Sequence, residues 1–151
     1  ELRDLLGSLG LRSFPLLTGG KGIHLVLPLQ RRQQWPSIKE FSRGVAMTLE
    51  RSAPQRFTTN MRKDARHGRI FVDYLRNERG STAIVPWSTR AHEGAPVAMP
   101  VTWNELADCR GSSQFVVNEA ASRVAADPWV GYADVRQSIT RRMAERLDAA
   151  S

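Results

Sequence analysis

The 151-residue sequence predicts an α/β (α+β) fold, with a mixed sheet flanked by helices and followed by a helical tail. Two short apolar runs, 13–17 and 23–29, are typical of buried strands. Between 37 and 52, apolar residues recur at helical spacing, and a similar stripe marks the end of the sequence. Strands that alternate with helices favour a sheet covered by helices. The length suits one domain over 1–151 with a substantial core.

The N-terminal third is predicted to hold a helix, two strands and a longer helix. Leucines at helical spacing indicate that residues 1–10 are the end of a helix, which suggests that the element begins upstream. The two strands flank a glycine-rich turn. Ser37 and Glu40 form an expected capping box where the longer helix begins, and that helix should end near 52–54.

The middle of the chain is predicted to contain two further strands, at 70–75 and 81–86, followed by a loop at 89–100. Thr102 and Glu105 are placed to cap a short helix after this loop. Asp127 and Pro128 are the expected N-cap and first-turn residues of the helical tail.

The composition is that of a basic globular protein, with 41% hydrophobic and 25% charged residues and a net charge of +7. Such a surface favours nucleic acid, nucleotides or anionic lipid. Arginine far outnumbers lysine, which suits phosphate binding, although arginine-rich codon usage gives the same bias. No apolar run approaches membrane-spanning length, and Cys109 is the only cysteine. We therefore expect no signal peptide, no internal disulfide and a reducing compartment.

The most informative segment is the glycine-rich turn Thr18-Gly-Gly-Lys-Gly-Ile-His24. Glycines let backbone N–H groups approach an anion closely, and Lys21 adds a point charge. The turn is neither a Walker A loop nor a dinucleotide fingerprint, because Gly22 follows the lysine and a strand replaces the required helix. An anion cradle and a plain hairpin both fit, and spacing alone favours the hairpin.

Two polar residues stand out in the predicted strands. His24 is either a structural residue or a phosphate or general-acid contact. Asp73 follows an apolar run although aspartate is depleted in strands. Its carboxylate fits either an ion pair with Arg76 or Arg66 or a ligand of Mg²⁺ or Mn²⁺.

Three arginines lie in or beside the turns that flank these strands: Arg66, Arg76 and Arg90. Exposed arginines are usually solvated surface residues. If the strand ends converge, these three would surround one site and neutralise a triphosphate.

Several motifs occur in one order and together carry a resemblance to a known family. They are the turn Thr18–His24, Phe71-Val-Asp-Tyr-Leu-Arg-Asn77, Ser81-Thr-Ala-Ile-Val-Pro-Trp-Ser-Thr-Arg90, Gly94-Ala-Pro-Val97 and Asp127-Pro-Trp129. With them the chain resembles the polymerase (primase-like) domain of bacterial DNA ligase D, in the archaeo-eukaryotic primase superfamily. The resemblance covers nearly the whole chain and implies the C-terminal half of a primase-polymerase catalytic core.

This resemblance implies a nucleotidyltransferase that adds nucleotides to DNA ends in non-homologous end joining, with Mn²⁺ or Mg²⁺ as cofactor. It implies NTP or dNTP as substrate, Ku and the ligase and nuclease domains of the same protein as partners, and a bacterial cytoplasmic location at the nucleoid. The residues implied to contact the nucleotide are Thr18, Lys21, His24, Arg76, Arg90 and Arg66. Asp73 is implied as a metal-binding carboxylate and, with His24, as a catalytic residue.

Two departures from the family pattern bear on activity. Thr18 stands where the family has serine, so the hydroxyl is kept and a methyl is added. The family's Asp-x-Asp metal pair precedes the glycine turn, and residues 1–14 contain no such pair. Since two-metal chemistry needs several carboxylates, we expect these 151 residues alone to be inactive. The alternatives are a non-catalytic nucleotide- or DNA-binding relative and a structural partner of a ligase or Ku-type protein.

Overall fold

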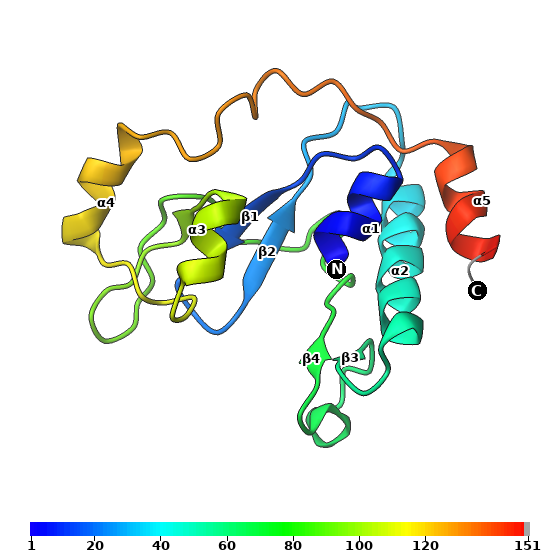
Figure 1. Ribbon diagram of the computed structural model, residues 1–151, viewed down its shortest axis with the longest axis horizontal. Helices are drawn as coiled ribbons and strands as arrows, with labels where there is room; N and C mark the ends of the chain where they lie inside the picture. The colour runs from blue at the N-terminus through cyan, green and yellow to red at the C-terminus, as the bar shows by residue number, and fades with distance from the viewer. Residues whose placement is uncertain (150–151) are drawn as a thin grey trace. The chain divides into compact units, whose positions relative to one another are not determined.

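The computed structural model describes residues 1–149, which fall into two compact units (Figure 1). Unit 1 contains Glu1–Leu11, Leu29–Thr82 and the chain from Arg136 onward, and unit 2 contains Arg12–Pro28 and Ala83–Val135. Helices combine with small antiparallel and parallel sheets, which confirms the predicted mixed α/β class. No helix in residues 1–149 is long and apolar enough to cross a lipid bilayer.

Unit 2 is built on a three-stranded antiparallel sheet with the order β2-β1-β5. Its strands are β1 (Phe14–Leu17), β2 (Ile23–Val26) and β5 (Met99–Pro100). All four residues of the central strand β1 are buried, as expected of a strand that is covered on both faces. In the register of β1 and β2, Leu16 lies opposite His24 and Leu17 lies opposite Ile23.

Two apolar clusters cover the sheet of unit 2, because successive side chains of β1 point to opposite faces. Phe14 and Leu16 pack with Ala98 and Trp129 in one cluster. The other cluster consists of Leu17, Val97, Met99 and Val101. Paired residues of adjacent strands share a face, so His24 lies on the same face as Leu16 and Trp129.

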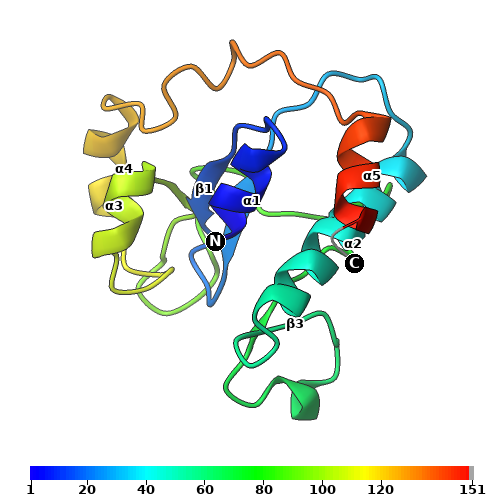
Figure 2. The same cartoon turned by 45° about the vertical axis from the view of Figure 1, so that its right-hand side comes forward.

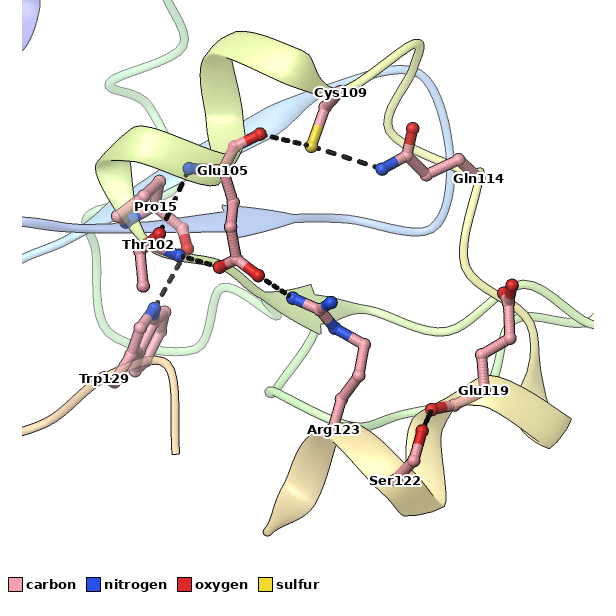
Figure 3. Close-up of polar contacts among 9 residues, drawn as sticks. All are labelled: Pro15, Thr102, Glu105, Cys109, Gln114, Glu119, Ser122, Arg123 and Trp129. Atoms are coloured by element: carbon pink, nitrogen blue, oxygen red, sulfur yellow. Dashed lines mark hydrogen bonds and ion pairs between the residues drawn. The ribbon is translucent and has the colours of Figure 1, made fainter. Parts of the chain in front are cut away.

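Two short helices, α3 (Trp103–Asp108) and α4 (Val117–Val124), complete unit 2. The predicted capping box is confirmed, since the Thr102 hydroxyl accepts a hydrogen bond from the Glu105 N–H and the Glu105 carboxylate accepts one from the Thr102 N–H. The same carboxylate pairs with Arg123 of α4 at 2.5 Å (Figure 3). Partial burial raises the pKa of Glu105, but the Thr102 N–H and the Arg123 guanidinium outweigh it and hold the pKa below its usual value.

Unit 1 is a small helical assembly around α2 (Trp35–Ser52), which α1 (Leu2–Ser8) and α5 (Arg141–Ala149) contact. Both views show α5 alongside α2 (Figure 1, Figure 2). The buried face of α2 consists of Phe41, Val45, Ala46 and Leu49. Leu147 of α5 packs against Gly44, where an added Cβ would lie 3.4 Å from the leucine Cδ1.

A two-stranded parallel sheet completes unit 1, formed by β3 (Phe57–Thr58) and β4 (Ile70–Phe71). The 3-10 helix η1 (Lys63–Arg66) lies in the connection between them. The strand predicted over 70–75 is therefore shorter than expected. The Asp73 carboxylate accepts a hydrogen bond from the Leu75 N–H at 3.0 Å, which closes a local turn that ends the extended run.

Two further sequence predictions are wrong at the ends of elements. The helix expected to begin at Ser37 begins at Trp35 with Gln34 as N-cap, so Ser37 lies inside the first turn and no capping box forms there. Pro36 is compatible with this start because the first helical N–H groups need no partner in the helix. Asp127 has φ +39, and its N–H bonds to Val124 O, so it follows the end of α4 rather than opening a helix.

The strand predicted over 81–86 does not form, and part of the loop predicted over 89–100 belongs to the sheet. Pro86 lacks an N–H, and Trp87 has φ +69, which ends the extended backbone. Pairing begins only after this point, where Trp87 N donates to Ala98 O at 2.7 Å and Ala98 N donates to Ser88 O at 2.8 Å. The expected loop, which is rich in small residues, therefore contains a buried segment that pairs with other parts of unit 2.

Candidate functional site

The glycine turn of unit 2 forms a tight connection between β1 and β2. Thr18 N donates to Gly22 O at 3.1 Å, and the Thr18 hydroxyl donates to the same carbonyl at 2.7 Å. Of the three glycines, only Gly19 has a left-handed backbone, with φ +67. The Thr18 side chain is buried and serves to close the turn.

A second segment of unit 2, which contains Ser112, forms hydrogen bonds with the turn. Thr18 N also donates to the Ser112 hydroxyl at 2.8 Å, and Gly19 N donates to Ser112 O at 3.0 Å. The Ser112 hydroxyl in turn bonds to Gly22 O. Ser112 is 94 positions from Thr18 in the sequence, and no local pattern around it signals the contact, so it could not be predicted from the sequence.

Arg90 lies over the turn. A Cβ added at Gly19 would lie 2.7 Å from Arg90 Cγ, and one added at Gly20 would lie 4.0 Å from an Arg90 guanidinium nitrogen. The backbone of Arg90 is fixed because its N–H donates to Pro96 O at 2.7 Å. Two predicted nucleotide-binding residues, Lys21 and Arg90, therefore lie at the same turn although they are far apart in the sequence.

The turn offers the groups that an anion requires. In the part of the chain that the structure describes, no group accepts a hydrogen bond from the N–H of Gly20 or Lys21. Lys21 is exposed, and a guanidinium nitrogen of Arg90 lies 4.0 Å from the place of a Gly20 Cβ. Unpaired amides next to two basic side chains are the groups that bind phosphate or another anion. His24 is half-buried on β2, two residues beyond Gly22.

The other predicted site residues lie in unit 1. Asp73 and Arg76 form an ion pair at 3.7 Å with both side chains exposed, and Arg76 also donates to Thr82 O at 3.3 Å. Arg66 lies with its guanidinium carbon 3.9 Å from the centre of the Phe71 ring. It also donates to Met61 O. The Asp73–Arg76 pair is one of the two roles predicted for Asp73, the other being a metal ligand.

The described residues do not by themselves fit a metal ion. Within residues 1–149, no cluster of three or more histidine, cysteine, aspartate or glutamate side chains could hold one. Asp73 offers one carboxylate, whose oxygens already bond to the Leu75 N–H and pair with Arg76. A divalent cation with oxygen ligands needs several such groups.

A known protein family matches most of the chain. Residues 1–129 match the family described as LigD, primase-polymerase domain. The multifunctional non-homologous end joining protein LigD of Pseudomonas aeruginosa is 42% identical over 147 residues, which are 95% of this chain and 18% of that protein. The bifunctional non-homologous end joining protein LigD of Bacillus subtilis is 34% identical over 125 residues, which are 82% of this chain and 20% of that protein.

A solved structure matches nearly the whole fold. The polymerase domain of Mycobacterium tuberculosis ligase D, determined in complex with DNA, is 35% identical and superposes with a TM-score of 0.79. The match covers 98% of this chain and 47% of that one. The chain thus spans about half of the solved domain and about a fifth of the curated relatives.

Proposed function

Because this chain belongs to the LigD primase-polymerase domain family, we propose that it is part of a nucleotidyltransferase that adds nucleotides to DNA ends. In this proposal the glycine turn and Arg90 bind the phosphates of an incoming NTP or dNTP. The two units together form part of one polymerase domain. DNA ends are the second substrate, and Ku and the ligase and nuclease domains of a longer protein are the partners.

The packing of Arg90 over Gly19 and Gly20 is the observation that carries this proposal. Nucleoside triphosphates are bound by cations together with backbone amides, because such preorganised groups stabilise the negative charge of the phosphates without having to reorganise during phosphoryl transfer. The turn supplies the amides of Gly20 and Lys21, and the two side chains supply the cations. In this arrangement Thr18 acts by closing the turn.

For Asp73, Arg76 and Arg66, and for the contact of His24 with the nucleotide, the proposal rests on the sequence motifs. Family members use divalent metal ions, and Asp73 is the one residue proposed to bind them here. Two-metal phosphoryl transfer requires several carboxylates, with the ions about 3.5–4 Å apart. We therefore propose that these 151 residues bind nucleotide but do not extend a primer on their own.

The binding claim is tested by titrating ATP into the 151-residue chain and into Lys21→Ala and Arg90→Ala. Each substitution removes one cation from the turn and should weaken binding by about tenfold. Arg110→Ala removes an exposed arginine of the same unit and should leave the affinity unchanged. If neither Lys21→Ala nor Arg90→Ala weakens binding, the phosphate site lies elsewhere.

The second candidate function is a relative that binds nucleotide or DNA without catalysis. The absence of a metal-binding cluster within residues 1–149 favours it for the isolated chain. A primer-extension assay with Mn²⁺ separates activity from binding, and we expect no product from the 151-residue chain. Robust synthesis by this chain would contradict the proposed inactivity.

A further inference from the structure

We propose, on the basis of the function proposed above, that Ser112 is a positioning residue that holds the glycine turn in its phosphate-binding shape. Four hydrogen-bond contacts join Ser112 to the turn, one of them between the Ser112 and Thr18 hydroxyls at 3.3 Å. Its hydroxyl accepts from Thr18 N at 2.8 Å and donates to Gly22 O, and its carbonyl accepts from Gly19 N at 3.0 Å. Ser112 thus contacts the residues at both ends of the turn, although it follows them by about ninety positions.

These bonds decide which amides remain available to an anion. The N–H groups of Thr18 and Gly19 are occupied by Ser112. Within residues 1–149, the N–H groups of Gly20 and Lys21 have no acceptor. Ser112 therefore fixes the start of the turn and leaves its tip for the ligand.

The Ser112 hydroxyl is poorly placed to form a hydrogen bond with any other partner. Ser112 is 9% exposed, and its hydroxyl already makes one donated and one accepted hydrogen bond. A buried hydroxyl with both functions satisfied is held in one rotamer. Such a group acts on a ligand through the turn and does not touch the ligand itself.

Hydrogen bonds also stabilise the loop that contains Ser112, both before and after this residue. Gln114 accepts from Arg110 N at 2.8 Å and donates to Cys109 Sγ at 3.2 Å, as Figure 3 shows for the sulfur contact. Cys109 Sγ bonds in turn to Glu105 O of α3 at 3.2 Å. Phe115 O, just beyond, accepts from Val97 N at 2.9 Å.

The same hydrogen-bonded set also positions Arg90. Arg90 N donates to Pro96 O, next to Val97, and the Val97 carbonyl carbon lies 3.1 Å from the place of a Gly19 Cβ. These hydrogen bonds and close contacts therefore position three parts of the site together: the turn, the Arg90 side chain that lies over it, and the loop that contains Ser112. Preorganisation of this kind raises affinity because the ligand does not have to order the site.

The test compares ATP affinity in the wild-type chain, Ser112→Ala and Ser113→Ala. Ser113 is the exposed neighbour of Ser112, so its substitution makes the same chemical change without touching the turn. We expect Ser112→Ala, which removes the hydrogen bonds of the hydroxyl to the turn, to weaken ATP binding by about three- to tenfold, and Ser113→Ala to leave it unchanged. Ser112→Thr keeps the hydroxyl and should restore most of the affinity.

A double-mutant cycle with Lys21→Ala separates positioning from a general loss of stability. If Ser112 acts through the turn, its substitution costs less affinity once Lys21 is gone, so the two effects are not additive. Additive effects, or equal ATP affinity of the folded wild type and Ser112→Ala, overturn the inference. If Ser112→Ala does not fold, Ser112→Cys, a weaker donor of similar size, takes its place and should show an intermediate loss.

The failure of this inference is distinguishable from failure of the proposed function. ATP binding by the wild type that requires Lys21 and Arg90 but not Ser112 overturns the role of Ser112 alone. Absence of ATP binding by the wild type overturns both.

Discussion

The Cγ atom of Arg90 lies 2.7 Å from the position that a Cβ atom at Gly19 would occupy. Real Cβ atoms do not make contacts this short, so the absence of a side chain at Gly19 is what lets the arginine lie over the turn. The left-handed backbone of Gly19, with φ +67, favours glycine independently. Gly19 thus has a double role, in the path of the turn and in the placement of its cation.

Gly19→Ala should therefore lower both stability and ATP affinity. The left-handed backbone alone costs about 1–2 kcal/mol for alanine, and the collision displaces Arg90. Gly94→Ala is the matched control, because Gly94 has φ +78 but open space around its Cβ position. Chemical denaturation and ATP titration of both variants should show a loss of stability in both and a loss of affinity in Gly19→Ala only. Equal affinities would show that Arg90 does not depend on Gly19.

Thr18→Val should cost about 1 kcal/mol of unfolding free energy, because the hydroxyl bond to Gly22 O is lost while the shape of the side chain is kept. Thr18→Ser keeps this bond and should be nearly neutral. Urea denaturation measures the difference between the two variants. A Thr18→Val variant as stable as the wild type would mean that Ser112 alone is sufficient to close the turn.

Trp129 links the last irregular segment of unit 2 to β1. Its indole N–H donates to Pro15 O at 3.0 Å, and its ring stacks on Tyr132 with centroids 5.0 Å apart. Trp129→Phe should destabilise the protein by about 1–2 kcal/mol through lost packing and the lost hydrogen bond. Trp35→Phe at a half-exposed position should have a much smaller effect on the thermal midpoint. Comparable effects of the two substitutions would contradict this role of Trp129.

The depressed pKa of Glu105 predicts a pH-dependent stability. A carboxyl group whose pKa is lower in the folded state stabilises the protein above its unfolded pKa of about 4.3, and this contribution is lost as the pH falls through the folded value. Glu105→Gln should therefore be less stable than the wild type near neutral pH and approach it below about pH 4. Denaturation at several pH values tests this, with the exposed Glu93→Gln as control. A stability difference that does not change with pH would exclude the proposed linkage.

Local sequence patterns predicted the elements whose determinants lie close together in the chain. The capping box of Thr102 and Glu105 and the buried stripe of α2 follow directly from spacing. The glycine turn could be located from its composition. Its two alternative interpretations, hairpin and anion cradle, are both compatible with the geometry, since Thr18 and Gly22 close the hairpin and leave the tip amides available.

The remaining features depend on contacts between distant segments. Met99 and Pro100 become a strand because β1 is their neighbour, and nothing in a loop rich in small residues indicates this. Ser112 reaches Thr18 across 94 positions. Residues 81–86 have the composition of a strand, but Pro86 and the backbone of Trp87 prevent regular pairing. In each case tertiary context outweighs local propensity.

The most direct test of the central claim is a two-dimensional ¹H–¹⁵N NMR titration of the chain with ATP. If the turn binds phosphate, the amide signals of Gly20, Lys21 and Gly22 should shift together and saturate with one affinity. These shifts should be strongly reduced in Arg90→Ala. Shifts confined to other parts of the chain, or turn shifts that persist unchanged in Arg90→Ala, would contradict the assignment of this turn as the phosphate site.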